Sequence, residues 1–441
     1  MPNTIPDQER FEQARHCFAL GVRHFEAGRW AEAERCFLDS LQQLPDRAST
    51  RINLAATWLQ AGRLTEALAE LDRVLAAEPQ HADAWCHRAA ALSAQGRFAE
   101  ALSSAEKALA IDPHDGTALW RCGQALAACR RYDEAEATLA RLLALQPGHA
   151  EAWFQIGQLQ QRRGRLEEAL RSHERALTLA PTHAAAHSQR GTLLRELGRA
   201  DEAATAFERA MALGADAELH RFYIAALGRG GAGPARAPQA YVQALFDDYA
   251  DGFDTHLVQV LGYQAHQRLV AALAPWRSEE GFASALDLGC GTGLCGPLLR
   301  PQVRHLQGVD LSQPMLDRAA ALGVYDRLHR AELVEHLQHS DDRHDLVVAA
   351  DVFIYIGALE AVFEGARRVL RPGGVFAFSV EQADATEDVA LTAHLRYAHA
   401  RPYLQQLAQR HGFQWLRDQA APIRQDQRTA IAGLYVVLRR S

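Results

Sequence analysis

Residues 285–296 read Ala-Leu-Asp-Leu-Gly-Cys-Gly-Thr-Gly-Leu-Cys-Gly. The apolar run that begins at Phe282 passes directly into Gly289, Gly291 and Gly293, which is typical of a strand ending in a tight turn. Glycines suit such a turn because they adopt positive φ at little cost and let a ligand approach the backbone closely. The helix expected next would direct its free backbone N–H groups toward that ligand. The stretch therefore predicts a ligand-binding strand, turn and helix.

The spacing of these glycines differs from that of a dinucleotide fingerprint, which places glycines at the first, third and sixth positions. The sixth position here is Leu294, and Asp287 stands two residues before the first glycine. A carboxylate at that point would repel a pyrophosphate but would suit a ligand that carries a cationic amine. A second short strand, 305–309, leads to Asp310, where a ribose diol would be bound.

The Asp-x-Gly-x-Gly-x-Gly pattern that starts at Asp287, followed by Asp310, resembles motifs I and II of class I S-adenosylmethionine-dependent methyltransferases. The resemblance covers about residues 239–439 and implies an α/β Rossmann-like domain with a seven-stranded mixed sheet. It implies S-adenosyl-L-methionine as cofactor, whereas the alternative is a Rossmann domain for nicotinamide cofactors or nucleotides. By this resemblance the cofactor-binding residues are Asp287, Gly289, Cys290, Gly291, Gly293, Asp310, Leu311, Met315, Ala331, Glu332, Ala350 and Tyr249.

Some of these assignments have an alternative. Glu332 stands where the family usually has an Asp that binds the adenine amine, so the backbone of Ala331 is a second possible contact. Leu311 and Met315 would flank the adenine and ribose, although Met315 is equally expected as a core residue. Tyr249 would belong to an entry helix that covers the cofactor, or it would only pack that helix onto the sheet.

Apolar segments predict the remaining strands of this sheet, at 327–331, 345–351, 375–380, 413–416 and 431–438. The segment 382–401 is expected to be an insertion over the site. Because ligands gather at the carboxyl ends of parallel strands, Ala350 and Asp351 are expected beside the methyl donor. The alternative for Asp351 is a carboxylate that caps a helix.

The expected chemistry is displacement of an activated methyl group, in which positioning supplies much of the rate and a base is needed only for a poor nucleophile. His399 and Asp351 are the candidate bases, with Tyr355 or Tyr397 as positioning groups, although a lone His is more often an ordinary surface or core residue. The fourth strand is followed by neither an Asp/Asn-Pro-Pro-Tyr element nor a Cys, which disfavours methylation of nucleic-acid bases. Oxygen, nitrogen and carbon acceptors remain open, on a small-molecule, carrier-bound or protein substrate.

The first half of the chain repeats with a period of 34 residues. One column holds Gly28, Gly62, Gly96, Arg130, Gly164 and Gly198, each followed by Arg. A second column holds Ala33, Ala67, Ala101, Ala135, Ala169 and Ala203, and Pro closes five of the units. The glycine would end the first helix of a pair, the alanine would allow two helices to cross closely, and the proline would stop the second helix.

This pattern resembles the tetratricopeptide repeat, a helix pair that stacks on its neighbours. The resemblance predicts an all-α solenoid of six repeats, at 14–47, 48–81, 82–115, 116–149, 150–183 and 184–217. It implies a groove that binds a protein or peptide, and the alternative is an oligomerisation or purely structural scaffold. A capping helix would complete the solenoid at 14–227, before a Gly/Pro-rich linker at 228–238 and the second domain at 239–441.

The composition of the 441 residues is ordinary for a globular protein, with a net charge of −7 and a single Lys. This charge indicates no general surface for nucleic acid, and no apolar stretch is long enough to cross a membrane. The seven cysteines are scattered without a Cys-x-x-Cys pair, which predicts reduced thiols and no metal site. The N-terminus lacks the apolar segment of a secretory signal, so a cytoplasmic location is expected, and the abundant Ala, Leu and Arg indicate a GC-rich bacterial gene.

Two functions are favoured by the sequence, and modification of nucleic acid is a third, weaker alternative. The first is a methyltransferase whose repeats recruit a protein partner or a carrier-bound substrate. The second is a repeat scaffold or adaptor whose C-terminal domain is a catalytically silent sensor of the methyl donor. The complete set of Asp287, Gly289, Gly291 and Asp310 favours the enzyme.

Overall fold

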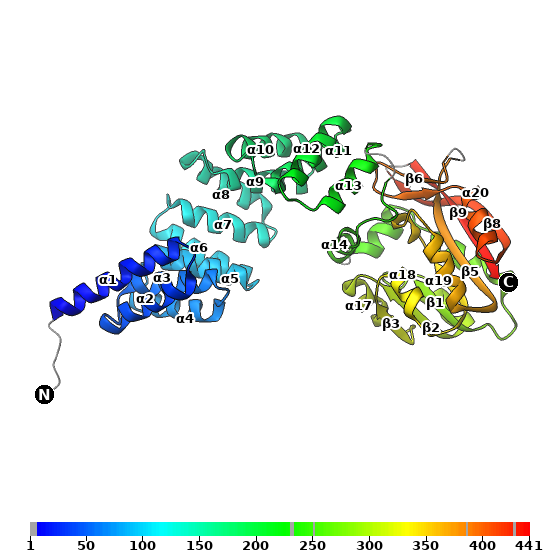
Figure 1. The fold of residues 1–441 in the computed structure, drawn as a ribbon, viewed down its shortest axis with the longest axis horizontal. Helices are drawn as coiled ribbons and strands as arrows, with labels where there is room; N and C mark the ends of the chain where they lie inside the picture. Colours follow the sequence, from blue (N-terminus) through cyan, green and yellow to red (C-terminus); the bar gives the residue numbers. More distant parts are fainter. Residues whose placement is uncertain (1–6, 230–232, 250–251, 385–386, 427–428) are drawn as a thin grey trace. The chain divides into compact units, whose positions relative to one another are not determined.

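The computed structural model describes residues 7–229, 233–249, 252–384, 387–426 and 429–441, and it divides into two compact units, Met1–Leu197 and Gly198–Ser441. In the first unit, consecutive helices pack against each other along the chain (Figure 1). They are α1 (Asp7–Glu26), α2 (Trp30–Gln43), α3 (Ala48–Gln60), α4 (Leu64–Ala77), α5 (Ala82–Ala94), α6 (Phe98–Ile111), α7 (Gly116–Ala128), α8 (Tyr132–Leu145), α9 (Ala150–Arg162), α10 (Leu166–Leu179) and α11 (Ala184–Glu196). Throughout the described ranges, no helix combines the length and the apolar character that crossing a membrane requires.

The two repeat columns have the physical roles that the sequence predicts. Each column alanine, from Ala33 to Ala203, is 0% exposed, as expected where two helices cross closely. Each column glycine ends a helix with a φ between 69° and 76°, and Gly62 closes the turn by donating to the carbonyl of Leu59. Arg130 holds the same left-handed conformation, at φ 59°, without the freedom of glycine.

Replacing Arg130 with glycine is expected to stabilise the helical array by about 0.5–1 kcal/mol, because a left-handed conformation costs a residue with a Cβ roughly 1–2 kcal/mol. The matched change Gly96→Ala should destabilise the array by about 1 kcal/mol, since its new Cβ would meet nothing within 4 Å and only the backbone strain would count. The urea midpoint of the helical transition measures both. Shifts of the same sign in the two variants would contradict this account.

The second unit begins with α12 (Ala200–Ala212) and α13 (Ala217–Ala226) and continues into an α/β part. Phe222 of α13 is fully buried in a cluster with Ala237, Ile354 and Tyr397, so the expected capping helix packs within this unit on the α/β part. The predicted linker contains residues 230–232, which lie outside the described ranges. The predicted domain boundaries therefore stay a prediction, whereas the compact units themselves divide after Leu197.

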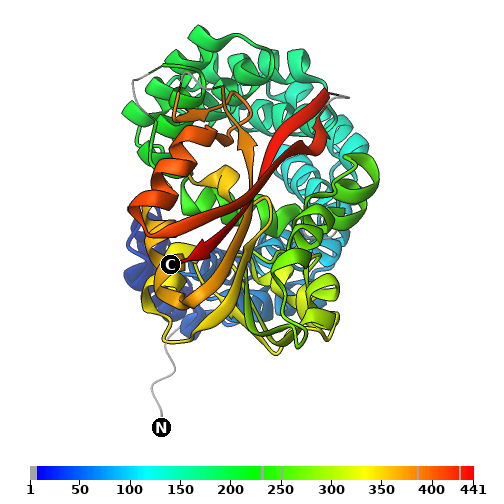
Figure 2. The same cartoon turned by 90° about the vertical axis from the view of Figure 1, so that its right-hand side faces the viewer.

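The α/β part is one mixed sheet with helices on both faces. Its order is β3-β2-β1-β4-β5, all parallel, with β9 antiparallel to β5 and β8 antiparallel to β9. Figure 2 shows the red C-terminal strands beside the orange strand β5. The strands are β1 (Phe282–Leu288), β2 (Val303–Asp310), β3 (Arg327–Arg330), β4 (His344–Ala349), β5 (Leu370–Gln382), β8 (Phe413–Asp426) and β9 (Thr429–Arg440). Helices α18 (Leu333–His339), α19 (Glu360–Val369) and α20 (Arg401–Arg410) cover one face, and α15 (Ala265–Ala272) and α16 (Gly296–Leu299) cover the other.

The prediction of a seven-stranded sheet is wrong in strand number, because the described residues form nine strands in the sheet. The additional pair, β6 (Val389–Leu391) and β7 (Tyr397–His399), lies in the segment expected to be an insertion. β7 pairs in parallel with the last two residues of β5, so the insertion satisfies its backbone groups by extending the sheet. Strand β8 is also longer than the segment 413–416 that its apolar residues predict.

Candidate active site

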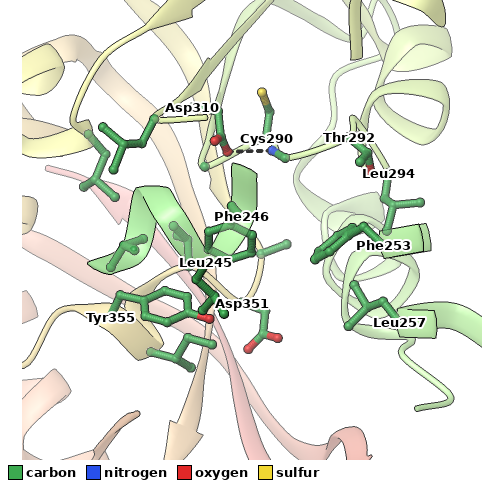
Figure 3. Close-up of a pocket in the computed structure, with 18 of the residues that line it drawn as sticks. Leu245, Phe246, Phe253, Leu257, Cys290, Thr292, Leu294, Asp310, Asp351 and Tyr355 are labelled. Carbon is green, nitrogen blue, oxygen red and sulfur yellow. Dashed lines mark hydrogen bonds between the residues drawn. The ribbon is translucent and has the colours of Figure 1, made fainter. Parts of the chain in front are cut away.

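A cavity of about 490 Å³ lies at the carboxyl ends of β1, β2 and β4, where α14 (Gln239–Tyr249) also contributes to its wall. Figure 3 shows Asp310 and Cys290 toward one end of this cavity, Asp351 with Tyr355 toward the other, and Phe246 between them. The cavity is lined by most of the predicted site residues, namely Asp287, Gly289, Cys290, Gly291, Asp310, Leu311, Ala331, Glu332, Ala350 and Asp351.

The turn after β1 has two glycines with different reasons to lack a side chain. At Gly289, with φ 65°, an added Cβ would lie 2.3 Å from the side chain of Val352, so close packing excludes it. At Gly291, with φ 53°, an added Cβ would meet nothing within 4 Å and would occupy open space beside the cavity. The turn therefore leaves its backbone open to a ligand at Gly291.

Asp310, at the end of β2, joins two elements of the site. Its Oδ2 accepts a hydrogen bond from the backbone N–H of Gly291 at 2.8 Å, and its Oδ1 accepts one from Ser312 at 2.9 Å. Burial raises the pKa of this carboxyl, and the backbone hydrogen bonds oppose that rise. A carboxylate that accepts one bond on each oxygen retains lone pairs for a diol in the cavity.

Asp287 is 1% exposed, and its Oδ2 accepts a hydrogen bond of 2.7 Å from the hydroxyl of Tyr325. Burial raises the pKa of Asp287 to about 7, and the nearby Asp310 adds to the rise, while the Tyr325 bond opposes it. A cationic group on a ligand would favour the ionised carboxylate. The sequence reasoning missed Tyr325. The indirect signal for it is the pair Gly293 and Gly296, because an added Cβ at either position would meet the Tyr325 ring.

Two predicted cofactor residues, Gly293 and Met315, are not among the described residues that line the cavity. Gly293 packs against the Tyr325 ring, and Met315 is fully buried in α17 (Gln313–Ala321), which fits its alternative as a core residue. The side chain of Tyr249 lies outside the part of the chain that the structure describes. The helix that carries it is nevertheless held near α17, because Ser312 Oγ donates to Asp247 at 2.6 Å.

Asp351 follows β4 and stands in the left-handed region at φ 56°, a conformation that Asp tolerates better than most residues. Its backbone N–H donates to Ser379 Oγ at 2.9 Å. Its two carboxylate oxygens accept from the same nitrogen, Nη1 of Arg424, at 3.2 and 2.9 Å, and the other terminal nitrogen of Arg424 donates to Glu381. The three side chains therefore form a buried ionic cluster, of which Asp351 and Arg424 line the cavity.

The charge state of Asp351 follows from this cluster. Burial raises the pKa of Asp351 to about 6, with Arg424 lowering it and Glu381 raising it further. Arg424 is 3% exposed and lines the cavity from β8. Sequence reasoning missed it, because it lies beyond the segment predicted as a strand and no motif surrounds it.

The prediction of His399 as a base does not fit its placement. His399 is 0% exposed, and its Nε2 lies 2.9 Å from the carbonyl oxygen of Ile356 and 3.1 Å from that of Gly357. An imidazole N–H that donates to two carbonyls holds the chain in place and faces no ligand. Tyr397 is likewise engaged, since its hydroxyl donates to the carbonyl of Pro234 at 2.6 Å.

His399 makes the second unit sensitive to acid. Burial lowers the pKa of His399 to about 4, so the unfolded chain binds a proton between pH 6.5 and 4 that the folded chain does not bind. Because of His399, the free energy of unfolding of the second unit is expected to fall by up to about 3 kcal/mol as the pH drops through this range. His399→Gln should flatten the pH dependence of the thermal midpoint while keeping an amide donor for the two carbonyls. An unchanged slope would contradict the assignment.

Comparison with known proteins agrees with both halves of this structure. Residues 286–378 match the family model of a methyltransferase domain, and residues 24–90, 92–162 and 154–218 match models of the tetratricopeptide repeat. The chain is 32% identical over 138 residues to malonyl-[acyl-carrier protein] O-methyltransferase of Pseudescherichia vulneris, covering 31% of this chain and 52% of that protein. It is 31% identical over 148 residues to the biotin biosynthesis bifunctional protein BioHC of Saccharophagus degradans, covering 33% of this chain and 25% of that protein.

Among solved structures, magnesium protoporphyrin IX methyltransferase from Synechocystis PCC 6803 with bound SAH aligns at 17% identity and a TM-score of 0.37, covering 46% of this chain and 99% of that one. The chain spans about half or less of the length of the two curated relatives. A methyltransferase domain implies S-adenosylmethionine as its cofactor. The chain thus carries N-terminal tetratricopeptide repeats followed by a C-terminal class I methyltransferase domain.

Proposed function

We propose that this protein transfers the methyl group of S-adenosylmethionine to an oxygen, nitrogen or carbon acceptor, and that its repeats recruit a protein partner. The observation that carries the proposal is that the Asp310 carboxylate and the Asp351 carboxylate line one and the same cavity. The first end suits a nucleoside, and the second leaves space for a methyl acceptor. The malonyl-[acyl-carrier protein] O-methyltransferase relatives support a carrier-bound acceptor beside small-molecule and protein ones.

The residues at the first end fit the methyl donor. Asp310 would accept hydrogen bonds from the ribose hydroxyls, Gly291 would allow close approach, and Asp287 would complement the cationic amine. Glu332 and Ala331 lie on the cavity wall for the adenine, although the Glu332 carboxylate also caps α18 by accepting from the N–H of Glu335 at 2.9 Å. When bound, this cofactor supplies an activated methyl group on a positively charged sulfur.

At the second end, we assign Asp351 to the acceptor. Its carboxylate lines the cavity, and Arg424 keeps it in position. A base in this position would take the proton that a hydroxyl or amine acceptor loses.

The free thiols of all seven cysteines support the expected cytoplasmic location.

The alternative of a silent sensor is separated from the enzyme by two measurements on the full-length chain. Calorimetry with S-adenosylhomocysteine tests the donor site, and incubation with methyl-labelled donor and bacterial lysate tests transfer. Binding with label transfer supports the proposal, and nuclease treatment of the lysate should leave the labelled acceptor intact. Tight binding without transfer to any lysate fraction would support the sensor, and absence of binding would overturn both.

A further inference from the structure

The acceptor end of the cavity contains an arginine that is already neutralised. Both terminal nitrogens of Arg424 are engaged, one with the two oxygens of Asp351 and the other with Glu381. The Arg424 side chain is 2% exposed, whereas that of Asp351 is 11% exposed. A molecule in the cavity therefore meets the carboxylate of this pair in preference to the guanidinium.

The other two arginines that line the cavity are also paired with carboxylates. Arg236 lies 3.6 Å from Glu332, and Arg396 lies 3.7 Å from Glu381. Glu381 is shared between Arg396 and Arg424, so the three arginines of the described wall face three carboxylates, Asp351, Glu381 and Glu332. Each of these arginines therefore already has a carboxylate partner within the protein.

Asp351 retains the capacity to accept further hydrogen bonds. An ionised carboxylate can accept about four hydrogen bonds. Arg424 donates to Asp351 from one nitrogen, Nη1, which leaves acceptor positions for a ligand. The surrounding wall is apolar, formed in part by Leu245, Phe246 and Tyr355. In such surroundings a hydrogen-bond donor or a cation beside the carboxylate is favoured, and a second anion is strongly disfavoured.

We infer that the methyl acceptor is a hydroxyl or amine on an apolar body, and that Asp351 accepts the hydrogen of that group. The inference rests on the proposed function and narrows its substrate class. On transfer, the acceptor oxygen or nitrogen would form the bond to the methyl carbon, the sulfur would keep the electrons of the broken S–C bond, and the released proton would pass to Asp351. A malonyl group carries a carboxylate, which would lie against the carboxylate of Asp351. The acceptor group of this protein is therefore expected to differ from the malonyl group named for the malonyl-[acyl-carrier protein] O-methyltransferase relatives.

The test uses three probes with one apolar body and different head groups: 3-phenylpropanol, 3-phenylpropylamine and 3-phenylpropanoate. Their dissociation constants are measured by calorimetry at pH 7.5 on the full-length chain saturated with S-adenosylhomocysteine. We expect the alcohol or the amine to bind at least about tenfold more tightly than the acid. The order of the first two distinguishes a hydroxyl acceptor from an amine acceptor.

Asp351→Asn is the decisive variant, because Asn tolerates the left-handed φ, removes the charge and keeps one oxygen that can accept from Arg424. It should reduce the preference for the favoured probe over the acid by about tenfold, whereas the exposed Asp341→Asn should leave it unchanged. Lowering the pH from 7.5 to 5.5 should reduce the same preference in the unmodified protein, because the pKa of Asp351 is about 6. The ionisable groups that interact with Asp351 are Arg424, Glu381, Tyr263, Tyr355 and Tyr435.

The outcomes separate the inference from the proposed function. Equal or tighter binding of the acid, an unchanged preference in Asp351→Asn, or no binding of any probe to the S-adenosylhomocysteine complex would overturn the inference alone. Failure of S-adenosylhomocysteine itself to bind would overturn the proposed function, and the inference with it. A preference for the alcohol or amine that depends on Asp351 and on pH would establish the acceptor class.

Discussion

Replacing Asp310 with alanine is expected to weaken binding of S-adenosylhomocysteine by the full-length chain about 100-fold, which corresponds to about 2.7 kcal/mol. The carboxylate holds the backbone N–H groups of Gly291 and Ser312 and faces the position proposed for the ribose. A hydrogen bond to a charged group contributes about 1.5–3 kcal/mol. The variant removes the hydrogen bonds to Gly291 and Ser312 as well as those proposed to the ribose. Calorimetry measures the change directly.

Two variants control this experiment. Asp310→Asn keeps one acceptor oxygen and should lose less affinity than the alanine variant. Asp317→Ala removes an exposed carboxylate from the neighbouring α17, where its partner is Gln313, and should change affinity by less than twofold. If Asp310→Ala bound the ligand within threefold of the unmodified protein, the donor site proposed here would be in the wrong place.

Replacing Arg424 with methionine is expected to lower the free energy of unfolding of the second unit by about 3–5 kcal/mol, because it leaves the buried Asp351 without its cation and leaves Glu381 only the longer contact of 3.7 Å with Arg396. The side chains of Asp351 and Glu381 are 11% and 9% exposed, so water compensates them poorly. For a unit of this size, such a loss corresponds to a fall of about 6–20 °C in the thermal midpoint. The pKa of Asp351 should rise further, since Arg424 is what lowers it.

The matched control is Arg371→Met. Arg371 pairs with Asp345 at 2.9 Å, but the two side chains are 46% and 29% exposed, and such a pair contributes at most about 1 kcal/mol. Combining Arg424→Met with Asp351→Asn and Glu381→Gln should recover part of the lost stability, because the buried carboxylates are removed together with their cation, and Arg396, which loses Glu381, is 27% exposed and keeps contact with water. Equal losses for Arg371→Met and Arg424→Met would contradict a buried cluster.

Local sequence patterns predicted most of the fold and one end of the site. The 34-residue period requires the same glycine and alanine environment in each repeat, and the structure shows those environments at Gly96 and Ala101. The spacing of Asp287 and Asp310 depends only on two adjacent parallel strands, so their meeting at one sheet edge followed from the sequence. Gly293 and Met315 were harder to place, because a glycine or methionine next to a site is equally suited to packing.

The sequence by itself determined the two kinds of architecture, the repeat period and the residues at the Asp310 end of the cavity, because each depends on neighbours along the chain. Only the tertiary structure decided which side chains surround Asp351 at the other end. His399 and Arg424 are both single residues without a surrounding motif. His399 is structural because it is buried against backbone carbonyls. Arg424 belongs to the cavity wall because it is buried between Asp351 and Glu381. These partners lie more than 40 residues away in the chain, so their contacts arise only when the strands assemble.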